Sequence, residues 1–407
     1  MWDLGAPCAS PCTRASQHTL IFDESYYVNA ARVIDRIKPP PSATYHDAPL
    51  GKDPNAEHPQ LAKLIMAGGI ELLGDGPWGW RLGSVLFGLG GLVAMYALAR
   101  AAGGGRWFAA GAAAVMALDN LALVHGRIGT LDIYALTPMI AACALYLRRR
   151  FLLAGLALGL GMAMKLVAVY LLPVLLLIEV IAFAVSRPRR GARFRPLMRR
   201  LAPPVVTAGV GIATLLLLVW LLGSLVPAYD PGSQTIYGGD PFRHIGHMLS
   251  YAANLKSVPH AVGISSSPWQ WLFDQKPISY ARVAVNVMSG GKIVASHALV
   301  SFRGVVNPFV MFLAIPALFA AVAAAWAERD RVAIVGTAWC LGAFIPFVIQ
   351  ADAFHRITYL YYVLVVLPGV YLVTVRLFAS RRMPVAATVG WAVALIYGFA
   401  DLYPLRG

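Results

Sequence analysis

A polar segment at residues 20–63 holds a large share of the few acidic residues in an otherwise apolar chain. It begins L-I-F-D-E-S-Y-Y-V-N-A-A-R and ends E-H-P-Q-L-A-K, and its candidate chemical groups are Asp23, Glu24, Asp53, Glu57 and His58. A positioned carboxylate can take the proton from a weak nucleophile such as a hydroxyl, which is general base catalysis. Asp23, Glu57 and His58 also stand where helix caps are expected, so capping is their structural alternative.

Candidate cations come from three further polar interruptions of the apolar sequence. Arg127 and Asp132 lie in R-I-G-T-L-D, Lys165 interrupts an apolar run, and His355 and Arg356 lie in D-A-F-H-R. Guanidinium groups fit phosphate with two parallel hydrogen bonds, so both arginines are candidates for binding an anion. Each candidate also has a structural alternative. Arg127 could form an ion pair with Asp132 or anchor the chain at the membrane interface. Lys165 could extend to the membrane surface, and His355 and Arg356 could simply belong to a basic outer loop.

The scaffold that positions these groups must be embedded in a membrane, because the composition is too apolar for a soluble protein. Of 407 residues, 58% are hydrophobic and 13% charged, whereas soluble domains carry about 25% charged residues. The apolar residues come in blocks of about 20, the length that spans a bilayer. We expect ten spans, approximately at residues 78–98, 107–124, 130–147, 151–164, 166–185, 203–226, 305–327, 332–349, 358–378 and 384–403.

Two of the assignments depend on charged residues near the apolar blocks. Residues 59–73 are short and carry Lys63 and Glu71, which predicts an interfacial helix rather than a span. Residues 151–185 are split at Lys165 because both flanks, at 148–150 and 187–200, are strongly basic and should lie on the same side.

The basic residues also predict the orientation of the chain. If residues 20–63 lie outside, the inner loops hold Arg100, Arg106, Arg148, Arg149, Arg150, the basic run at 187–200, Arg329, Arg331, Arg381 and Arg382. This is the positive-inside pattern, so the net charge of +15 does not indicate nucleic-acid binding. The candidate acids and cations then fall on the outer face. Because ionisable groups at membrane depth usually line a cavity, we expect a site there that handles an anion and a proton.

The connection at 227–304 is too long to be a simple loop. Its first part, 240–255, is predicted to form an amphipathic surface helix, and its second part, 266–280, is rich in aromatic residues. Trp269 and Trp271 suit either a belt at the lipid headgroups or a wall that binds a sugar or peptide. We therefore divide the chain into an outer first loop (1–77), the first spans (78–226), the outer connection (227–304) and four final spans (305–407).

The cysteines and the N-terminal residues add little chemistry. Cys143 and Cys340 lie in apolar blocks and are expected to be buried, whereas Cys8 and Cys12 could pair or stay free. No metal-ligand spacing occurs. The first residues, M-W-D-L-G-A-P-C-A-S-P-C, are predicted to be neither a signal peptide nor a span.

Taken together, these motifs resemble the protein O-mannosyltransferase family of GT-C glycosyltransferases, whose wider relatives include the lipid A aminoarabinose transferases. The resembling stretches are F-D-E-S-Y-Y at 22–27, E-H-P-Q-L-A-K at 57–63, R-I-G-T-L-D at 127–132, the glycine-rich run ending at Lys165, and S-P-W-Q-W-L-F-D-Q-K-P-I-S-Y at 267–280. Gln60 and Ala62 depart from the second motif. The family's first span and its large outer insert domain are also missing from the pattern.

The resemblance implies an all-α polytopic GT-C bundle with an extracytoplasmic loop layer, in the plasma membrane. It implies transfer of a sugar, mannose by precedent, from a polyprenyl phosphate to a hydroxyl of a protein, glycan or lipid, with inversion. The implied catalytic groups are Asp23 as the base, Glu24 and Glu57. The implied donor-phosphate ligands are Arg127, Lys165, His355 and Arg356, and the groups that shape the acceptor site are His58, Asp132, Trp269 and Trp271.

The clustered acids could hold a divalent ion, but the cations make a metal dispensable, so we expect no required cofactor. Two other functions fit part of the pattern: a transporter or flippase of a lipid-linked anion, and a non-catalytic relative that only binds lipid. A transporter leaves two acidic motifs in one loop unexplained, and the hydropathy shows no inverted repeat. Retention of Asp23, Glu57 and Arg127 disfavours the non-catalytic alternative.

Overall fold

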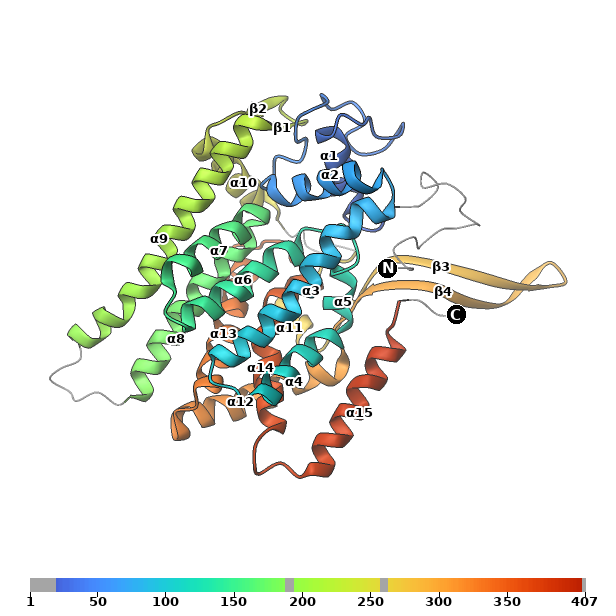
Figure 1. Cartoon of the computed structure of the whole chain (residues 1–407). Helices are drawn as coiled ribbons and strands as arrows, with labels where there is room; N and C mark the ends of the chain where they lie inside the picture. The colour runs from blue at the N-terminus through green and yellow to red at the C-terminus, as the bar shows by residue number, and fades with distance from the viewer. Residues whose placement is uncertain (1–19, 187–193, 257–262, 405–407) are drawn as a thin grey trace.

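The computed structural model describes residues 20–186, 194–256 and 263–404, and helices dominate it (Figure 1). Within these residues, five helices are long and apolar enough to cross a membrane: α3 (Pro77–Ala101), the Leu166–Val185 segment, α9 (Phe194–Leu225), α12 (Pro308–Glu328) and α13 (Arg331–Asp352). Four shorter apolar helices are α6 (Asp132–Leu147), α7 (Phe151–Met164), α14 (Leu367–Phe378) and α15 (Val385–Asp401). The predictions for Cys8, Cys12 and the N-terminal residues lie outside the described residues.

Every predicted span contains a helix, but three are interrupted. The second span divides into α4 (Arg106–Ala117) and α5 (Asn120–His125), because Asp119 caps α5 by accepting a hydrogen bond from Ala122 N at 3.1 Å. The fifth begins with a 3-10 turn, η3 (Leu166–Tyr170), before α8 (Leu171–Val185), and the ninth begins with η4 (Leu360–Val365) before α14. These breaks matter for function, since η3 and η4 both line the main cavity described below.

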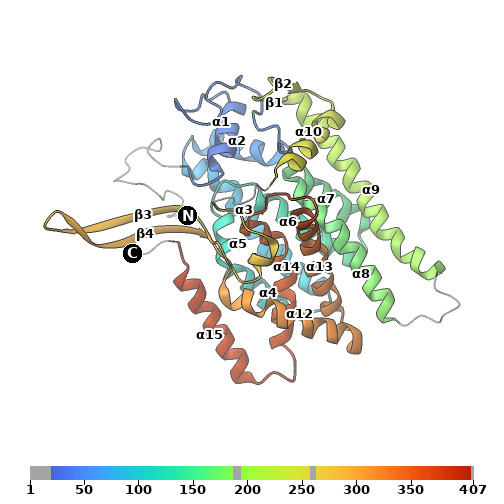
Figure 2. The same ribbon diagram turned by 180° about the vertical axis from the view of Figure 1, so that it is seen from behind.

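The outer layer is built from the first loop and part of the long connection. It contains α1 (Glu24–Ile34), α2 (Leu61–Leu73), the strands β1 (Ala228–Asp230) and β2 (Thr235–Tyr237), and α10 (Pro241–Asn254), which gather at the top of Figures 1 and 2. Asp53 joins the two parts by backbone hydrogen bonds, from its N–H to Pro227 O at 3.0 Å and from Tyr229 N–H to its carbonyl at 2.7 Å. The predicted interfacial helix and amphipathic helix therefore share one layer.

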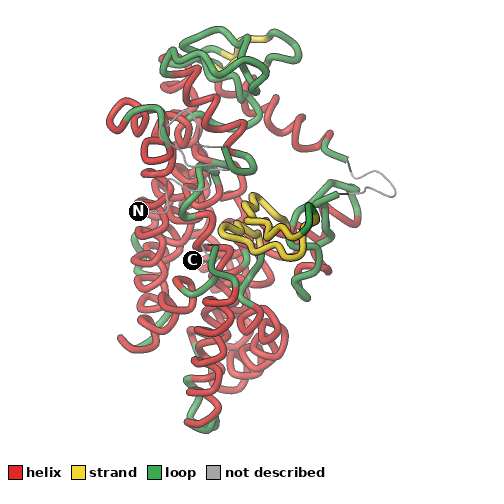
Figure 3. Tube along the Cα trace, turned by 90° about the vertical axis from the view of Figure 1, so that its right-hand side faces the viewer, coloured by secondary structure: helices red, strands yellow, loops and turns green. Residues whose placement is uncertain are grey.

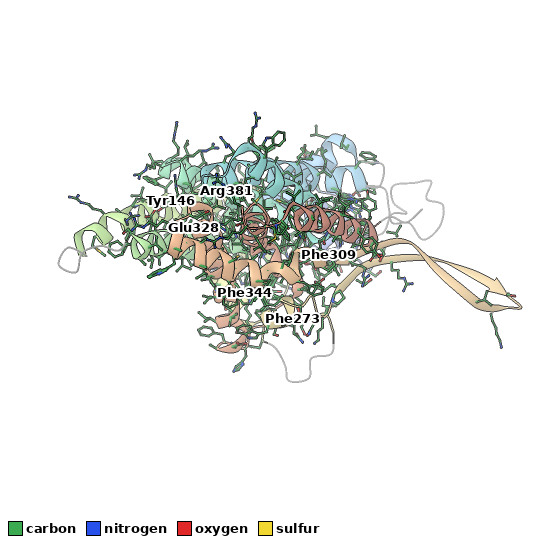
Figure 4. All side chains as sticks on the ribbon, turned by 90° about the horizontal axis from the view of Figure 1, so that it is seen from below. Tyr146, Phe273, Phe309, Glu328, Phe344 and Arg381 are labelled. Atoms are coloured by element: carbon green, nitrogen blue, oxygen red, sulfur yellow. The ribbon has the colours of Figure 1, made fainter. Side chains whose placement is uncertain are left out.

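The opposite end of the bundle carries the turns that were predicted to be cytoplasmic. The α3–α4, α12–α13 and α14–α15 turns lie at the bottom of Figure 1, away from α1, α2 and α10. Figure 4 looks onto this end and labels Glu328 and Arg381. Arg376 pairs there with Glu328 at 3.1 Å and with Asp330 at 3.0 Å.

The second half of the long connection contains strands that the sequence analysis did not predict. After the short α11 (Pro268–Trp271), β3 (Ile278–Ser289) and β4 (Lys292–Gly304) form an antiparallel hairpin that projects from the bundle (Figures 1 and 4). In Figure 3 the hairpin points towards the viewer, so its yellow strands are seen nearly end-on. Gly290 and Gly291 form its turn with φ values of 57° and 77°, which the mirror-image turns of tight hairpins require. The G-G pair between two runs rich in β-branched residues was the available signal.

Candidate active site

A cavity of about 700 Å³ lies between the outer layer and the outer ends of the membrane helices. Its walls come from the first loop, α1, α6, η3, α10, α13 and η4, which are far apart in the sequence. It brings together six of the predicted site residues: Asp23, Glu57, His58, Asp132, Lys165 and Arg356. The cavity therefore collects carboxylates and cations from four separate segments of the chain, as the sequence predicted.

Asp23 stands at the start of α1 but does not cap it. Its side chain accepts no capping hydrogen bond from the helix, so its carboxylate is available to the cavity that it lines. Burial raises the pKa of Asp23 to about 6; the positive charge of Lys165 opposes this and the negative charge of Asp132 adds to it. A carboxylate with this pKa is ionised at neutral pH and is basic enough to accept a proton.

The backbone of Phe22 makes the sharp turn that leads into Asp23. Its φ of 52° lies in the left-handed region, which is costly for a bulky residue. Its ring stacks on Tyr280 of β3, with centroids 4.2 Å apart, and meets the edge of Tyr361 of η4 at 5.4 Å. These two contacts oppose the cost of the turn.

Lys165 and Asp132 form an ion pair on the cavity wall. The backbone of Lys165 is extended (φ −156°, ψ 130°) where α7 ends, and its Nζ lies 2.7 Å from Asp132 Oδ1 at the start of α6. The lysine Nζ also lies 5.6 Å from the centre of the Tyr361 ring. The alternative of an Arg127–Asp132 pair is thus corrected: Asp132 pairs with Lys165, because the end of α7 meets the first turn of α6.

Arg356 is the second strong cation of the cavity. Its Nη1 donates to Gln350 Oε1, and Gln350 in turn donates to the hydroxyl of Tyr170. Its Nε is buried and has no hydrogen-bond partner among the described residues. A buried guanidinium N–H that lacks a partner suits an anion within the cavity. Lys256, which the sequence analysis missed, also lines the cavity and donates to Phe354 O at 3.0 Å.

A buried ion pair shapes the loop that carries Glu57 and His58. Lys63 Nζ lies 2.6 Å from Asp53 Oδ2, with both side chains fully buried, and also donates to Asn55 O at 2.6 Å and His58 O at 3.0 Å. The Asn55 amide then donates to Glu57 Oε2 at 2.9 Å. Lys63 therefore ties the ends of the loop together, and Asp53 is a structural rather than a cavity residue.

Burial shifts the pKa values of Glu57 and His58 in opposite directions. Burial raises the pKa of Glu57, with backbone hydrogen bonding and Lys63 opposing it. Burial, together with the nearby positive charges of Lys165, Lys63 and Arg356, lowers the pKa of His58 well below its ordinary value. His58 is therefore a neutral imidazole near pH 7, which can either donate or accept one hydrogen bond at the cavity.

Glu24, which was predicted to be catalytic, does not line the cavity. Its carboxylate is fully buried and binds Arg81 of α3 through two contacts of 2.7 Å, and it also accepts hydrogen bonds from Ile21 N and Gly129 N. The prediction is corrected because neighbouring residues of a helix point about 100° apart, so Glu24 faces the bundle where Asp23 faces the cavity. An arginine inside an apolar span was the signal for such a partner.

Arg127, which was predicted to bind the donor phosphate, lies in a separate cavity of about 310 Å³. That cavity is lined mainly by apolar residues of α3, α4 and α5, together with Tyr403. The guanidinium carbon lies 5.7 Å from the centre of the Phe302 ring and 5.4 Å from that of Tyr403. The prediction is corrected because α5 ends at His125, so the following turn directs Arg127 towards β4 and the C-terminal segment.

The remaining predicted residues, His355, Trp269 and Trp271, do not line the cavity. His355 is exposed, with a φ of 51°. Trp269 is 51% exposed and donates to Asp352 Oδ2 at 3.1 Å. Trp271 is fully buried and packs edge-on against Phe347 and Tyr362, which do line the cavity. Trp271 therefore packs behind the cavity wall rather than on it.

Tyrosines form much of the cavity wall, and the sequence analysis did not assign them a role. Those that line it are Tyr26, Tyr27, Tyr170, Tyr251, Tyr359, Tyr361 and Tyr362. The repeated Y-Y at 26–27 and Y-L-Y-Y at 359–362 were the available signals. For metal binding, no group of three or more His, Cys, Asp or Glu side chains comes together within the described residues.

Comparisons with known proteins agree with this architecture. Residues 57–222 match the family model for dolichyl-phosphate-mannose-protein mannosyltransferases. The chain is 24% identical to a polyprenol-phosphate-mannose–protein mannosyltransferase of Corynebacterium glutamicum, over 86% of this chain and 75% of that protein.

Two solved structures resemble the fold. The S. cerevisiae protein O-mannosyltransferase Pmt1-Pmt2 complex bound to the sugar donor has a TM-score of 0.67 at 12% identity, over 95% of this chain and 86% of that chain. ArnT from Cupriavidus metallidurans bound to undecaprenyl phosphate has a TM-score of 0.53 at 21% identity, over 92% and 59%. At these identities the likeness concerns the fold alone.

Proposed function

We propose that this chain, a GT-C glycosyltransferase of the protein O-mannosyltransferase family, transfers mannose from a polyprenyl phosphate to a hydroxyl acceptor in the 700 Å³ cavity. The observation that carries the proposal is the joint placement of Asp23, Lys165 and Arg356 on the walls of one cavity. A proton acceptor and two cations are what a hydroxyl nucleophile and a phosphate leaving group require.

The donor phosphate is held by Lys165 and Arg356. The unpartnered Nε of Arg356 offers a hydrogen bond to a phosphate oxygen, and Lys165 adds a positive charge fixed by Asp132. Both charges stabilise the negative charge that grows on the phosphate as the sugar departs. The polyprenyl chain lies against the apolar part of the wall, which includes Leu166 and Val169 of η3 and Val365 of η4.

Asp23 acts as the base in a single displacement. The acceptor oxygen attacks the anomeric carbon from the face opposite the phosphate, and the bond between that carbon and the phosphate oxygen breaks. Its electron pair leaves with the polyprenyl phosphate, and the hydroxyl proton passes to Asp23, so the anomeric configuration inverts. The raised pKa of Asp23 suits this transfer near neutral pH.

Glu57 and His58 contact the acceptor side of the reaction. Both line the cavity on the outer-layer side, where neutral His58 can hydrogen-bond to an acceptor hydroxyl. The acceptor is a protein, following the name of the relative, with Ser or Thr as its hydroxyl residues, or else a hydroxyl of a glycan or lipid. The arginine-rich turns at the other end of the bundle support an extracytoplasmic site in the plasma membrane.

The test is a panel of short-chain polyprenyl phosphates that carry different sugars, given to the purified full chain with peptide and glycan acceptors. Transfer of mannose, with release of the polyprenyl phosphate and inversion at the anomeric carbon, is the expected outcome. Absence of transfer from every donor, in a preparation that binds these donors, would contradict the proposal and favour a transport or binding function.

A further inference from the structure

Tyr280, at the root of the projecting hairpin, links the hairpin to the residue that precedes Asp23. Its ring is nearly parallel to that of Phe22, with an interplanar angle of 21° and centroids 4.2 Å apart. Tyr280 itself is 8% exposed and does not line the cavity, whereas Phe22 and Asp23 do. Tyr280 therefore contacts the Asp23 segment through Phe22.

The hydroxyl of Tyr280 is held by a fully buried histidine. His125 Nε2 lies 3.0 Å from the Tyr280 hydroxyl, and His125 Nδ1 lies 3.1 Å from Thr130 Oγ1 and 3.8 Å from Asp132 Oδ2. The carboxylate favours the proton on Nδ1, so Nε2 accepts a hydrogen bond from the tyrosine O–H. The His125 ring also stacks on Tyr361, with centroids 5.7 Å apart and an interplanar angle of 27°.

The Phe22 ring thus packs against two aromatic rings, and one histidine contacts both of them. Tyr280 and Tyr361 both contact the Phe22 ring, and His125 contacts both of them. These ring contacts matter because the left-handed φ of Phe22 turns the chain immediately before Asp23. If the ring were free, the backbone would relax towards the ordinary region and the Asp23 carboxylate would move.

We propose that Tyr280 and His125 are positioning residues for the transfer reaction, which hold Phe22 in its left-handed turn and thereby aim the Asp23 carboxylate. The inference rests on the proposed function. It assigns a role to a residue of the hairpin and to a buried histidine that the mechanism above does not use. General base catalysis depends on the distance between the base and the hydroxyl, and misplacement by about 1 Å can cost about 100-fold in rate.

The experiment is a double-mutant cycle on kcat, with Tyr280→Phe, His125→Phe and the double variant in the purified full chain. Tyr280→Phe keeps the ring on Phe22, and His125→Phe keeps a ring on Tyr361, but each removes the hydrogen bond between the two. We expect each single variant to lose about 10- to 100-fold in kcat, with KM for mannosyl polyprenyl phosphate within about twofold of wild type. The double variant should be no slower than the slower single variant, because both remove the same interaction.

A matched control removes an equivalent hydrogen bond elsewhere. The Tyr237 hydroxyl bonds to His247 Nδ1 at 2.9 Å, and neither residue lines the cavity. Tyr237→Phe should therefore keep the wild-type kcat.

Phe22→Leu provides the second variant, because leucine fills the space of the ring but cannot stack on Tyr280. If Phe22 only fills space, this variant should keep the wild-type kcat. If the stacked ring positions Asp23, it should lose kcat as Tyr280→Phe does.

These experiments separate a failure of the positioning role from a failure of the proposed transferase function. If the wild type transfers mannose but Tyr280→Phe and Phe22→Leu keep its kcat, the positioning role is wrong and the transferase function stands. The positioning role is also wrong if the kcat loss of the double variant equals the product of the two single losses, because the two residues would then act independently. If Tyr280→Phe does not fold, as its melting temperature would show, Phe22→Leu alone decides between the two predictions. Absence of transfer by the wild type counts against the transferase function itself.

Discussion

Lys165 Nζ lies 2.7 Å from Asp132 Oδ1, so the end of α7 is joined to the first turn of α6 on the wall of the cavity. The pair keeps the ammonium in one place while leaving two of its three N–H donors for a ligand. It also explains why an apolar hairpin of two membrane helices tolerates a lysine at its tip. The Lys165–Asp132 ion pair thus gives the donor phosphate a fixed cation rather than a mobile one.

Replacing Lys165 with Met should weaken donor binding. The methionine keeps most of the side-chain volume but removes the charge and leaves Asp132 without its partner. Hydrogen bonds to charged groups are worth about 1.5–3 kcal/mol, which corresponds to a loss of about 10- to 100-fold in affinity. Titration with a short-chain polyprenyl phosphate measures it. Lys276→Met, at an exposed lysine outside the cavity lining, is the control and should bind as wild type.

The two arginines should behave differently, because they lie in different cavities. Arg356→Gln should lower donor affinity by about 10-fold or more while the melting temperature changes little, since the side chain lines the donor cavity. Arg127→Gln should instead lower the melting temperature and leave donor affinity near wild type, because its guanidinium packs on Phe302 and Tyr403. The reverse pattern would restore Arg127 as the phosphate ligand and contradict that role for Arg356.

Much of the candidate site followed from the sequence because its motifs lie on the predicted outer side of the membrane. Asp132, Lys165 and Arg356 each stand where an apolar block meets an outer loop, Asp23 and Glu57 lie in the outer first loop, and the structure brings all five to one cavity. Charge asymmetry and span length constrain which ends lie together, and this is enough to collect the residues.

The predictions that were wrong or missing concern side-chain directions, which only tertiary packing decides. Glu24 follows Asp23 directly, yet it points into the bundle because Arg81 requires a carboxylate there. Arg127 leaves the site because α5 ends early and the turn after it faces β4. Tyr280 could not be predicted as a neighbour of Phe22, since their contact depends on where the hairpin root docks.

The buried Lys63–Asp53 pair should be a determinant of stability and, through the loop, of activity. Lys63→Met leaves Asp53 buried without its cation and frees the carbonyls of Asn55 and His58, so a loss of about 3–5 kcal/mol is expected. The Lys63→Met/Asp53→Asn double variant should recover part of that loss. Thermal unfolding in detergent measures both, and equal melting temperatures for wild type and Lys63→Met would contradict the assignment.

Activity should depend on pH through Asp23. Its pKa of about 6 means that the carboxylate is ionised and active above pH 6, and that protonation removes the base as the pH falls below it. We expect kcat/KM to rise with a midpoint near pH 6 and to fall about tenfold per unit well below it. His58 should not contribute there, because its pKa is already well below its ordinary value. His58→Gln should therefore keep the same midpoint.

Asp23→Asn decides whether Asp23 is the base of the transfer reaction, with sugar transfer and donor binding measured on the same preparation. Asparagine keeps the shape of the side chain but cannot accept the proton, so turnover should fall by about 100- to 10,000-fold. Donor affinity should stay within a few-fold of wild type, because Lys165 and Arg356 are untouched. Transfer at the wild-type rate by Asp23→Asn would contradict the role of Asp23 as the base.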